Sequence, residues 1–243
     1  MKPFCFLGTR AEDDVADGEY AGVLGFSGLD ESELVRFRVE AEPLPELDLA
    51  DWSGIVLGGG PFNVSDPPEA KSPAQRRAEA QLRRLAERVV AADFPFFGAC
   101  YGIGTLGTLA GGVVDRTYGE PIGALPVRLN EAGRADPLLG VLPPTFQAFV
   151  GHKEAVTELP RGAVNLASSA GCPVHAFRMG RNVYATQFHP ELDVAELCAR
   201  IDAYRHHGYF EPHEQDDLKA AARAAVVTEP PRLLARFVDL YAA

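Results

Sequence analysis

The chain has 243 residues, 47% of them hydrophobic, and its 34 acidic against 23 basic residues give a formal net charge of −11. This size fits one large domain with a full core, while the negative charge disfavours binding to nucleic acid or to an anionic membrane surface. No apolar run is long enough for a signal peptide or a membrane span, so we expect a cytoplasmic protein whose partners are small molecules or proteins. The four widely spaced cysteines form no C-x-x-C motif and suggest neither a disulfide framework nor a metal site.

In the first third of the chain, apolar runs predict strands at residues 4–7 and 54–57, and an alternating pattern predicts one at residues 34–40. Residues 13–26 carry apolar side chains at roughly helical spacing, but glycines interrupt them. The pattern therefore leaves the structure of this segment open.

A helix is predicted to begin at Ser72, because Ser72 can cap it, Pro73 suits its first turn and Gln75 completes a capping box. One apolar face extends from there to Val89, and residues 94–97 predict the next strand. Strand, helix and strand in this order are typical of a parallel, doubly wound sheet. Active sites in such sheets lie beyond the carboxyl ends of the strands.

Short β-like runs between residues 111 and 187 predict strand ends and hairpins that extend the sheet. Three helices with an apolar face are predicted after Asp193. An exposed tail would not carry so much apolar surface, so we expect these faces to cap the core or to form a docking surface. We predict an α/β domain over residues 1–192, with a doubly wound, mostly parallel sheet flanked by helices. A C-terminal helical extension is predicted over residues 193–243.

The pentapeptide Gly98-Ala99-Cys100-Tyr101-Gly102 joins the strand at 94–97 to a helix-like segment. Glycines two positions either side of an apex residue allow a sharp turn from strand to helix, which holds the apex in a strained, exposed conformation. The apex here is Cys100, and it stands at a helix N-terminus, where free N–H groups favour the thiolate. We interpret Cys100 as a nucleophile rather than as a cysteine of the core.

A second motif, Gln187-Phe188-His189-Pro190-Glu191, follows the last predicted strand. Pro190 favours an extended conformation at His189, so the side chains of His189 and Glu191 point to the same side and can form a hydrogen bond. The carboxylate then orients the imidazole and leaves its other nitrogen to exchange a proton with a thiol. Alone this motif is typical of a surface turn, but with Cys100 it predicts a Cys-His-Glu triad.

Together with the upstream loop Gly58-Gly59-Gly60-Pro61, these motifs resemble the class I glutamine amidotransferases, specifically the glutaminase part of GMP synthetases. The resemblance covers most of residues 1–192. It implies hydrolysis of the side-chain amide of glutamine through a γ-glutamyl thioester on Cys100. His189 would be the general acid and base, and Glu191 its orienting partner.

The resemblance also implies an oxyanion hole formed by the backbone N–H groups of Gly60 and Tyr101. It assigns substrate binding to Gly59, Gly151 and His152, and it calls for no cofactor. The family usually has Ser where this chain has Gly151, so a contact there can come only from the backbone.

Gly104 is a larger departure, because amidotransferases commonly place a glutamine four residues after the nucleophile. A stand-alone γ-glutamyl amide or peptide hydrolase is therefore an alternative, in which Gly104 widens the pocket. A non-catalytic binding module is a third alternative, against which the intact triad argues. No synthetase signature occurs in the chain, so an ammonia-accepting synthetase on another chain is a candidate partner, as is a second copy of this chain.

The remaining histidines and cysteines are expected to be structural. His206, His207 and His213 lack the spacing of a metal site and are expected to be exposed in the helical extension. His175 is expected on a strand surface or as a satisfied core residue. Cys198 lies on an apolar helix face and is expected to be inert.

Overall fold

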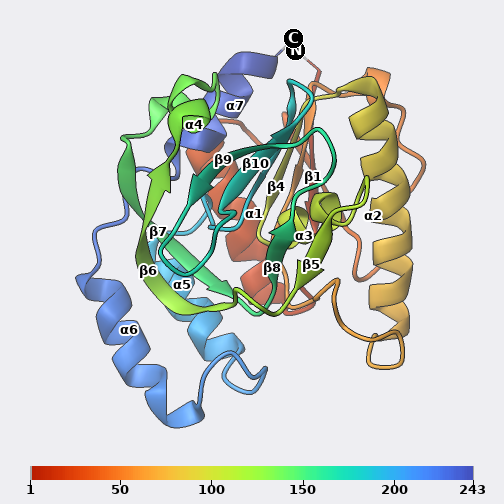
Figure 1. The fold of residues 1–243 in the computed structure, drawn as a ribbon. Helices are drawn as coiled ribbons and strands as arrows, with labels where there is room; N and C mark the ends of the chain where they lie inside the picture. The colour runs from red at the N-terminus through yellow and green to blue at the C-terminus, as the bar shows by residue number, and fades with distance from the viewer. Residues whose placement is uncertain (1, 243) are drawn as a thin grey trace.

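The structure, a computed structural model, describes residues 2–242. Its centre is a nine-stranded mixed sheet with helices against both faces (Figure 1). The parallel part of the sheet consists, in sheet order, of β2 (Leu34–Arg38), β1 (Phe4–Gly8), β3 (Gly54–Leu57), β4 (Phe96–Ala99) and β11 (Val183–Thr186). The antiparallel part continues with β10 (Ala176–Met179), β9 (Val164–Ser168), β6 (Glu120–Leu129) and β7 (Thr145–His152).

A second, two-stranded sheet pairs β5 (Val113–Asp115) with β8 (Ala155–Glu158) in front of the main sheet in Figure 1. The sequence pattern indicated a strand at β5 but none at β8. Four residues are too few for an alternating pattern to stand out, and two of them, Ala155 and Val156, are buried side by side.

Helices cover the two faces of the main sheet. On one face lie α2 (Pro73–Ala92) and α3 (Tyr101–Gly107), and on the other α1 (Asp13–Ser27) and α7 (Arg232–Tyr241). A smaller cluster joins α5 (Val194–Ala203) and α6 (Gln215–Ala224) to β7. The short helix α4 (Glu131–Ala135) and single 3₁₀ turns at Leu49–Asp51, Leu139–Val141 and Pro212–Glu214 complete the chain. The predicted fold class, a doubly wound α/β sheet flanked by helices, is confirmed.

Helix α2 begins where the sequence predicts. The Ser72 hydroxyl accepts a hydrogen bond from the Gln75 N–H at 3.0 Å, which is the expected N-cap. The Gln75 side chain does not complete a capping box, because its amide donates to the carbonyl oxygen of Asn63 at 3.1 Å and to Glu79 at 2.9 Å. It therefore ties the helix start to the loop that follows β3.

The segment at residues 13–26, which the sequence left open, is the continuous helix α1. Its interrupting glycines permit close packing: a Cβ atom at Gly22 would overlap the carbonyl oxygen of Glu191, and one at Gly18 would overlap the carboxylate of Glu196. The glycines lower the intrinsic helix propensity and at the same time allow α1 to lie against the segment around Glu191.

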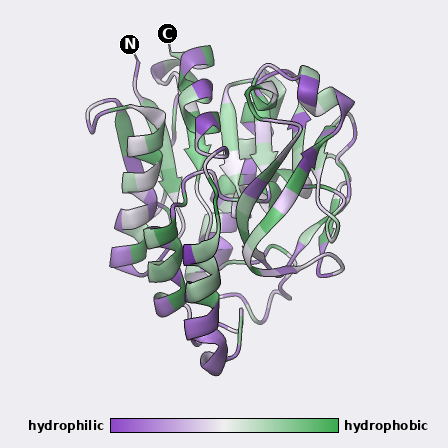
Figure 2. Cartoon of the chain, turned by 90° about the vertical axis from the view of Figure 1, so that its left-hand side faces the viewer, coloured by the Kyte–Doolittle hydropathy of each residue, from purple (hydrophilic) through white to green (hydrophobic). Residues whose placement is uncertain are grey.

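The C-terminal helices cap the core. Leu233, Leu234 and Phe237 of α7 pack with Phe4 and Phe97 of the sheet. Figure 2 shows the same arrangement, with hydrophobic residues on the inner sides of the helices and hydrophilic ones outside. Within residues 2–242 the large hydrophobic side chains that are exposed are only Val113, Val164 and Val226. The expected docking surface on these helices is thus not present as an apolar patch on the described part of the chain.

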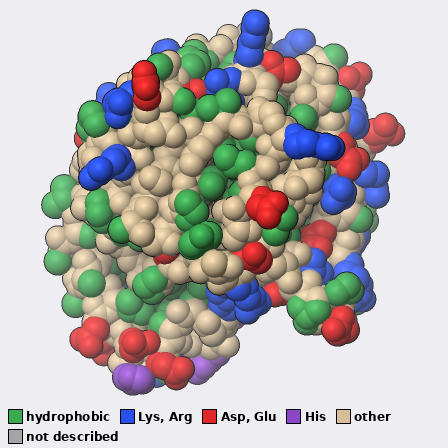
Figure 3. Space-filling model, in the orientation of Figure 1, with side chains coloured by type: hydrophobic (Ala, Val, Ile, Leu, Met, Phe, Trp, Pro, Cys, Tyr) green, Lys and Arg blue, Asp and Glu red, His purple; other side chains and the backbone are tan. Residues whose placement is uncertain are grey.

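The surface carries mixed charges, and histidine side chains reach it at the lower end of the molecule in Figure 3, below α6. His206, His207 and His213 are exposed, as expected. Among the described residues no helix combines the length and the apolar character that crossing a bilayer requires.

Candidate active site

Cys100 occupies the sharp turn between β4 and α3. Its backbone has φ 48° and ψ −88°, a conformation that residues other than glycine rarely adopt. A Cβ at Gly98 would lie 2.8 Å from the Cα of Gly102, so position 98 requires glycine for the strand to pack against the start of α3. The Cys100 N–H donates to the carbonyl oxygen of Thr186 at 2.8 Å, which fixes the turn to the end of β11. The predicted elbow is confirmed.

His189 and Glu191 follow β11 and lie beside this elbow. The Nδ1 atom of His189 is 2.7 Å from Oε1 of Glu191, and His189 lines the same small cavity as Cys100. Burial by itself lowers the pKa of His189, but the charge of Glu191 and the contact with Cys100 outweigh it and raise the pKa to about 9. The structure therefore brings the three predicted side chains together and favours the imidazolium form at neutral pH.

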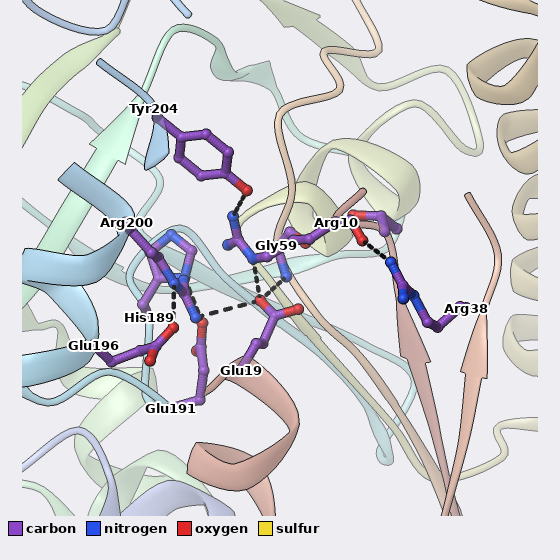
Figure 4. Close-up of polar contacts among 10 residues, drawn as sticks. Arg10, Glu19, Arg38, Gly59, His189, Glu191, Glu196, Arg200 and Tyr204 are labelled. Atoms are coloured by element: carbon purple, nitrogen blue, oxygen red, sulfur yellow. Dashed lines mark hydrogen bonds and ion pairs between the residues drawn. The ribbon is translucent and has the colours of Figure 1, made fainter. Parts of the chain in front are cut away.

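Arg200 of α5 lies beside the carboxylate of Glu191, above it in the view of Figure 4. Its Nη1 atom lies 3.0 Å from Oε1 of Glu191 and 3.3 Å from Nδ1 of His189, and all three side chains are buried. Burial alone raises the pKa of the Glu191 carboxyl, but the charges of His189 and Arg200 outweigh it and hold the pKa well below its usual range. Glu191 thus stays ionised and keeps the ring oriented.

A second buried ion pair lies next to the first. Nε of Arg10, just after β1, is 2.9 Å from Oε1 of Glu19 on α1, and the same oxygen accepts the N–H of Gly59 at 3.0 Å. Arg10 also donates to the hydroxyl of Tyr204 at 2.8 Å. These contacts, drawn in Figure 4, connect α1, the glycine loop and the end of α5 directly to the site.

The glycine loop after β3 is fixed on both sides. The Thr9 hydroxyl donates to the carbonyl oxygen of Gly59 at 2.7 Å, and a Cβ at Gly60 would overlap that hydroxyl. Gly60 lines the cavity next to Cys100. Within residues 2–242, the N–H groups of Gly60 and Tyr101 donate to no acceptor. Both N–H groups are therefore available to a ligand.

The other wall of the site comes from β7. Gly151 lies in the cavity wall beside Cys100, and His152 lines an adjoining hollow together with Gly104. The two spaces measure only about 40 and 20 Å³. On the same measure a single water molecule needs roughly 10–15 Å³, so both spaces can hold water, and both are partly open to solvent.

The chain matches the family model described as glutamine amidotransferase class-I over residues 28–201. It belongs to this family. GMP synthases [glutamine-hydrolyzing] from Citrobacter koseri and Streptomyces avermitilis are 33% and 30% identical to it, over 58% and 62% of this chain and 25% and 26% of theirs. The matched part thus spans about a quarter of the length of these curated relatives.

Solved structures show that the fold is shared along nearly the whole chain. A glutamine amidotransferase from Thermotoga maritima superposes with a TM-score of 0.72 at 21% identity, covering 98% of this chain and 99% of that one. A glutamine amido transferase from Methylobacillus flagellatus gives 0.71 at 19% identity, covering 100% and 94%.

Gly104, where amidotransferases commonly have glutamine, borders the hollow that His152 lines, but its neighbours crowd the position that a Cβ would take. A Cβ there would lie 3.2 Å from both Oε1 of Glu154 and Cγ2 of Val64. The Glu154 carboxylate is anchored by the N–H groups of Val64 and Ser65, both at 2.8 Å. Glu154, which follows β7, and Val64, which follows β3, therefore lie close to the first atom of the missing side chain.

Sequence reasoning missed Arg10, Glu19, Arg200 and Tyr209 at this candidate site. Tyr209 lines both hollows beside Cys100, and the ammonium of Lys153 lies 4.2 Å from its ring centroid. Of these, only Arg200 carried a signal in the sequence, since it is a charged residue on the apolar face of α5, where Leu197, Ile201 and Tyr204 are buried. A charge on a buried helix face indicates a buried partner.

The other cysteine and histidine expectations have mixed outcomes. Cys198 is buried, as expected. His175 lies just before β10, fully buried, so a position on a strand surface is wrong. Its Nε2 atom lies 2.7 Å from Oε2 of Glu120, and its Nδ1 atom has no partner within the described residues, so it is only partly satisfied.

Proposed function

We propose that the chain hydrolyses the side-chain amide of glutamine through a thioester on Cys100 and releases ammonia. The observation that carries this proposal is Cys100 at a strained elbow beside His189, with the ring held by Glu191 and Arg200. A thiol next to a buried imidazole that an ionised carboxylate orients is the arrangement that activates a cysteine nucleophile.

The steps follow from this geometry. Nδ1 of His189 is engaged by Glu191, so Nε2 holds the proton of the Cys100 thiol while Sγ attacks the amide carbon. The developing oxyanion accepts hydrogen bonds from the N–H groups of Gly60 and Tyr101. Each of these bonds stabilises the transition state by ~3 kcal/mol. His189 then gives its proton to the departing nitrogen, ammonia leaves, and water hydrolyses the thioester to glutamate and free Cys100.

Substrate positioning is assigned to the opposite wall. The backbone groups of Gly151 and His152 and the carbonyl oxygen of Gly59 are proposed to hold the α-amino and carboxylate end of glutamine, because both ring nitrogens of His152 and the N–H of Gly59 already have partners. Gly59 is suited to a close approach, because a Cβ there would lie 2.7 Å from Cε1 of His189. Gly151 offers backbone groups only.

The ammonia acceptor is proposed to be a synthetase on another chain. This rests on the GMP synthases that the chain resembles, which are about four times longer than the matched part. Native mass spectrometry of the purified protein, alone and with a candidate synthetase, tests this. A glutaminase rate that no synthetase changes would contradict it.

The alternative of a γ-glutamyl peptide hydrolase relied on a wider pocket at Gly104. The contacts of Glu154 and Val64 at that position remove this support. The deciding experiment measures ammonia or amine release from glutamine, a γ-glutamyl dipeptide and γ-glutamyl anilide, with Cys100→Ser as the control. Cys100-dependent release fastest from glutamine is expected. Preference for the dipeptide would favour the hydrolase, and no turnover of any compound would overturn the proposed function.

A further inference from the structure

A second group of reactive side chains is buried in the antiparallel part of the sheet, apart from the catalytic group. Glu120 on β6 and His152 on β7 face each other across the ladder, and Cys172 and His175 come from the loop between β9 and β10. One potential ligand atom of each lies within 4.8 Å of the other three. Their exposed fractions are 8% for Glu120, 5% for His152, 1% for Cys172 and 0% for His175.

We propose that these four residues form a binding site for one divalent metal ion with the ligand preferences of zinc. Two imidazoles, a thiolate and a carboxylate are the donors that zinc takes, whereas calcium and magnesium prefer oxygen ligands alone. Four protein ligands with no access for solvent are typical of a structural zinc site rather than of a catalytic one.

The spacing of the donors is close to that which zinc requires. At bond lengths of roughly 2.0–2.3 Å, the donors of a tetrahedral site stand roughly 3.3–3.8 Å apart. In the structure Oε2 of Glu120 lies 2.9 Å from Nε2 of His152 and 2.7 Å from Nε2 of His175, and no pair of the four exceeds 4.8 Å. Displacements of about an ångström therefore convert the cluster into a tetrahedral site.

The hydrogen bonds show what the ion would replace. Nδ1 of His152 faces the carbonyl oxygen of Glu154 at 2.9 Å, which can only accept, so this nitrogen carries a proton. The contacts between the two Nε2 atoms and Oε2 of Glu120 require protons as well. A dication placed among these three atoms takes over the role of those protons, with the ring nitrogens and the carboxylate oxygen as its ligands.

Outer contacts already orient the ligands. The bond from Nδ1 of His152 to a backbone carbonyl is the contact that metal-binding histidines usually make with their second nitrogen. The Ser169 hydroxyl is 2.5 Å from the other carboxylate oxygen of Glu120 and accepts the N–H of Cys172 at 2.8 Å. Ser169 thus ties the thiol loop to the carboxylate.

The charge balance points the same way. Among the described residues Glu120 forms ion pairs only with His152 and His175, and with no Lys or Arg. Glu191, which is also buried, has the guanidinium of Arg200 beside it. A buried carboxylate without a permanent cation is costly, and a bound dication supplies the missing charge.

The test uses zinc alone with the full chain. Metal is stripped with a chelator, zinc is titrated in competition with a chromophoric chelator, and bound metal is counted by mass spectrometry. The Cys100→Ser background prevents capture by the catalytic thiol, and His206→Asn, His207→Asn and His213→Asn together remove the exposed histidines. We expect one zinc per chain in all these forms.

Variants of the ligands complete the test. Cys172→Ser and His175→Gln are each expected to weaken zinc binding at least tenfold, whereas Cys198→Ser, which changes another buried cysteine, should not. Cobalt gives an independent readout, because a thiolate-to-cobalt absorption band should appear and vanish in Cys172→Ser. Circular dichroism checks that each variant is folded. No stoichiometric zinc, or binding lost only with the exposed histidines, would overturn the site and leave the proposed glutamine hydrolysis untouched.

Discussion

Two groups of Cys, His and Glu side chains lie in this molecule, and they differ in access and in charge. Cys100 is partly exposed at a turn with positive φ, whereas Cys172 is buried in a loop that places no strain on it. In the first group Glu191 raises the pKa of His189 to about 9 against the effect of burial. In the second, burial prevails and lowers the pKa of His175, although Glu120 is adjacent.

The difference shows that residue types alone do not make a nucleophile. Burial raises the pKa of the Cys172 thiol to about 11, so it is protonated at neutral pH and closed to a substrate. Arg200 fixes the charge of Glu191 in the catalytic group, and Glu120 has no such partner. Exposure at the elbow and the permanent cation behind the carboxylate distinguish the group that we propose to be catalytic from the buried one.

The largest effect should come from replacing Cys100 with serine, and the same change at Cys172 gives the matched comparison. Cys100→Ser is expected to reduce glutamine hydrolysis by at least ~1,000-fold, because the hydroxyl is a far weaker nucleophile beside this imidazole. Cys172→Ser should reduce it by less than about tenfold, since no substrate reaches that residue. Ammonia release measures both rates, and the opposite order would reverse the two assignments.

Removing the cation behind Glu191 should cost stability. Arg200→Met leaves Glu191 and Glu19 buried with less compensation, and a broken buried pair costs about 3–5 kcal/mol of unfolding free energy. Arg83→Met on α2 breaks an exposed pair with Glu87 and should cost less than about 1 kcal/mol. Urea unfolding of both variants gives the comparison, and equal losses would refute it.

Glu191→Gln should weaken catalysis and change its pH dependence. The rate is expected to fall about tenfold to a hundredfold, because the amide orients His189 but does not stabilise its charge. Loss of that charge lowers the pKa of His189, so the imidazolium that protonates the leaving ammonia is lost at lower pH. The basic limb of the kcat/KM profile should therefore move down from near pH 9. An unmoved limb would assign it to another group.

Gly104→Gln should have the smallest effect. It restores the side chain that is common in the family, yet we expect it to lower stability rather than to improve glutamine binding. The added side chain meets Glu154 and Val64, and such overpacking costs about 1–3 kcal/mol of stability. Glutamine KM should not improve, and Gly104→Ala, which adds only a Cβ, should cost less. Thermal melts and glutaminase kinetics measure these effects. A lower KM in the glutamine variant would mean that Glu154 moves aside easily.

Features that depend on neighbouring residues could be predicted from the sequence. The glycines around Cys100 and the proline between His189 and Glu191 restrict the backbone locally, so the elbow and the His–Glu contact follow from the motifs. In the parallel half, β1, β3 and β4 were apparent as apolar runs and β2 as an alternating pattern. The roles of these residues in catalysis remain a proposal.

Features that depend on the assembled fold could not be predicted. The helix α1 was obscured by Gly18 and Gly22, whose purpose appears only when α5 and the Glu191 segment lie against them. The cluster around Glu120 unites residues from β6, β7 and a distant loop without any ligand spacing in the sequence. Buried charges such as Glu19 become interpretable only once their partners are located.

The hydrogen bond between Arg10 and Tyr204 joins residues 194 positions apart, so the site that it connects forms late. Contacts of such long separation form late in folding, since the intervening chain must first be ordered. The ribosome releases β1, the glycine loop and Cys100 well before His189 and Arg200 appear. A growing chain therefore displays the thiol without its proton partner, and we expect glutamine turnover to begin only after α5 has docked.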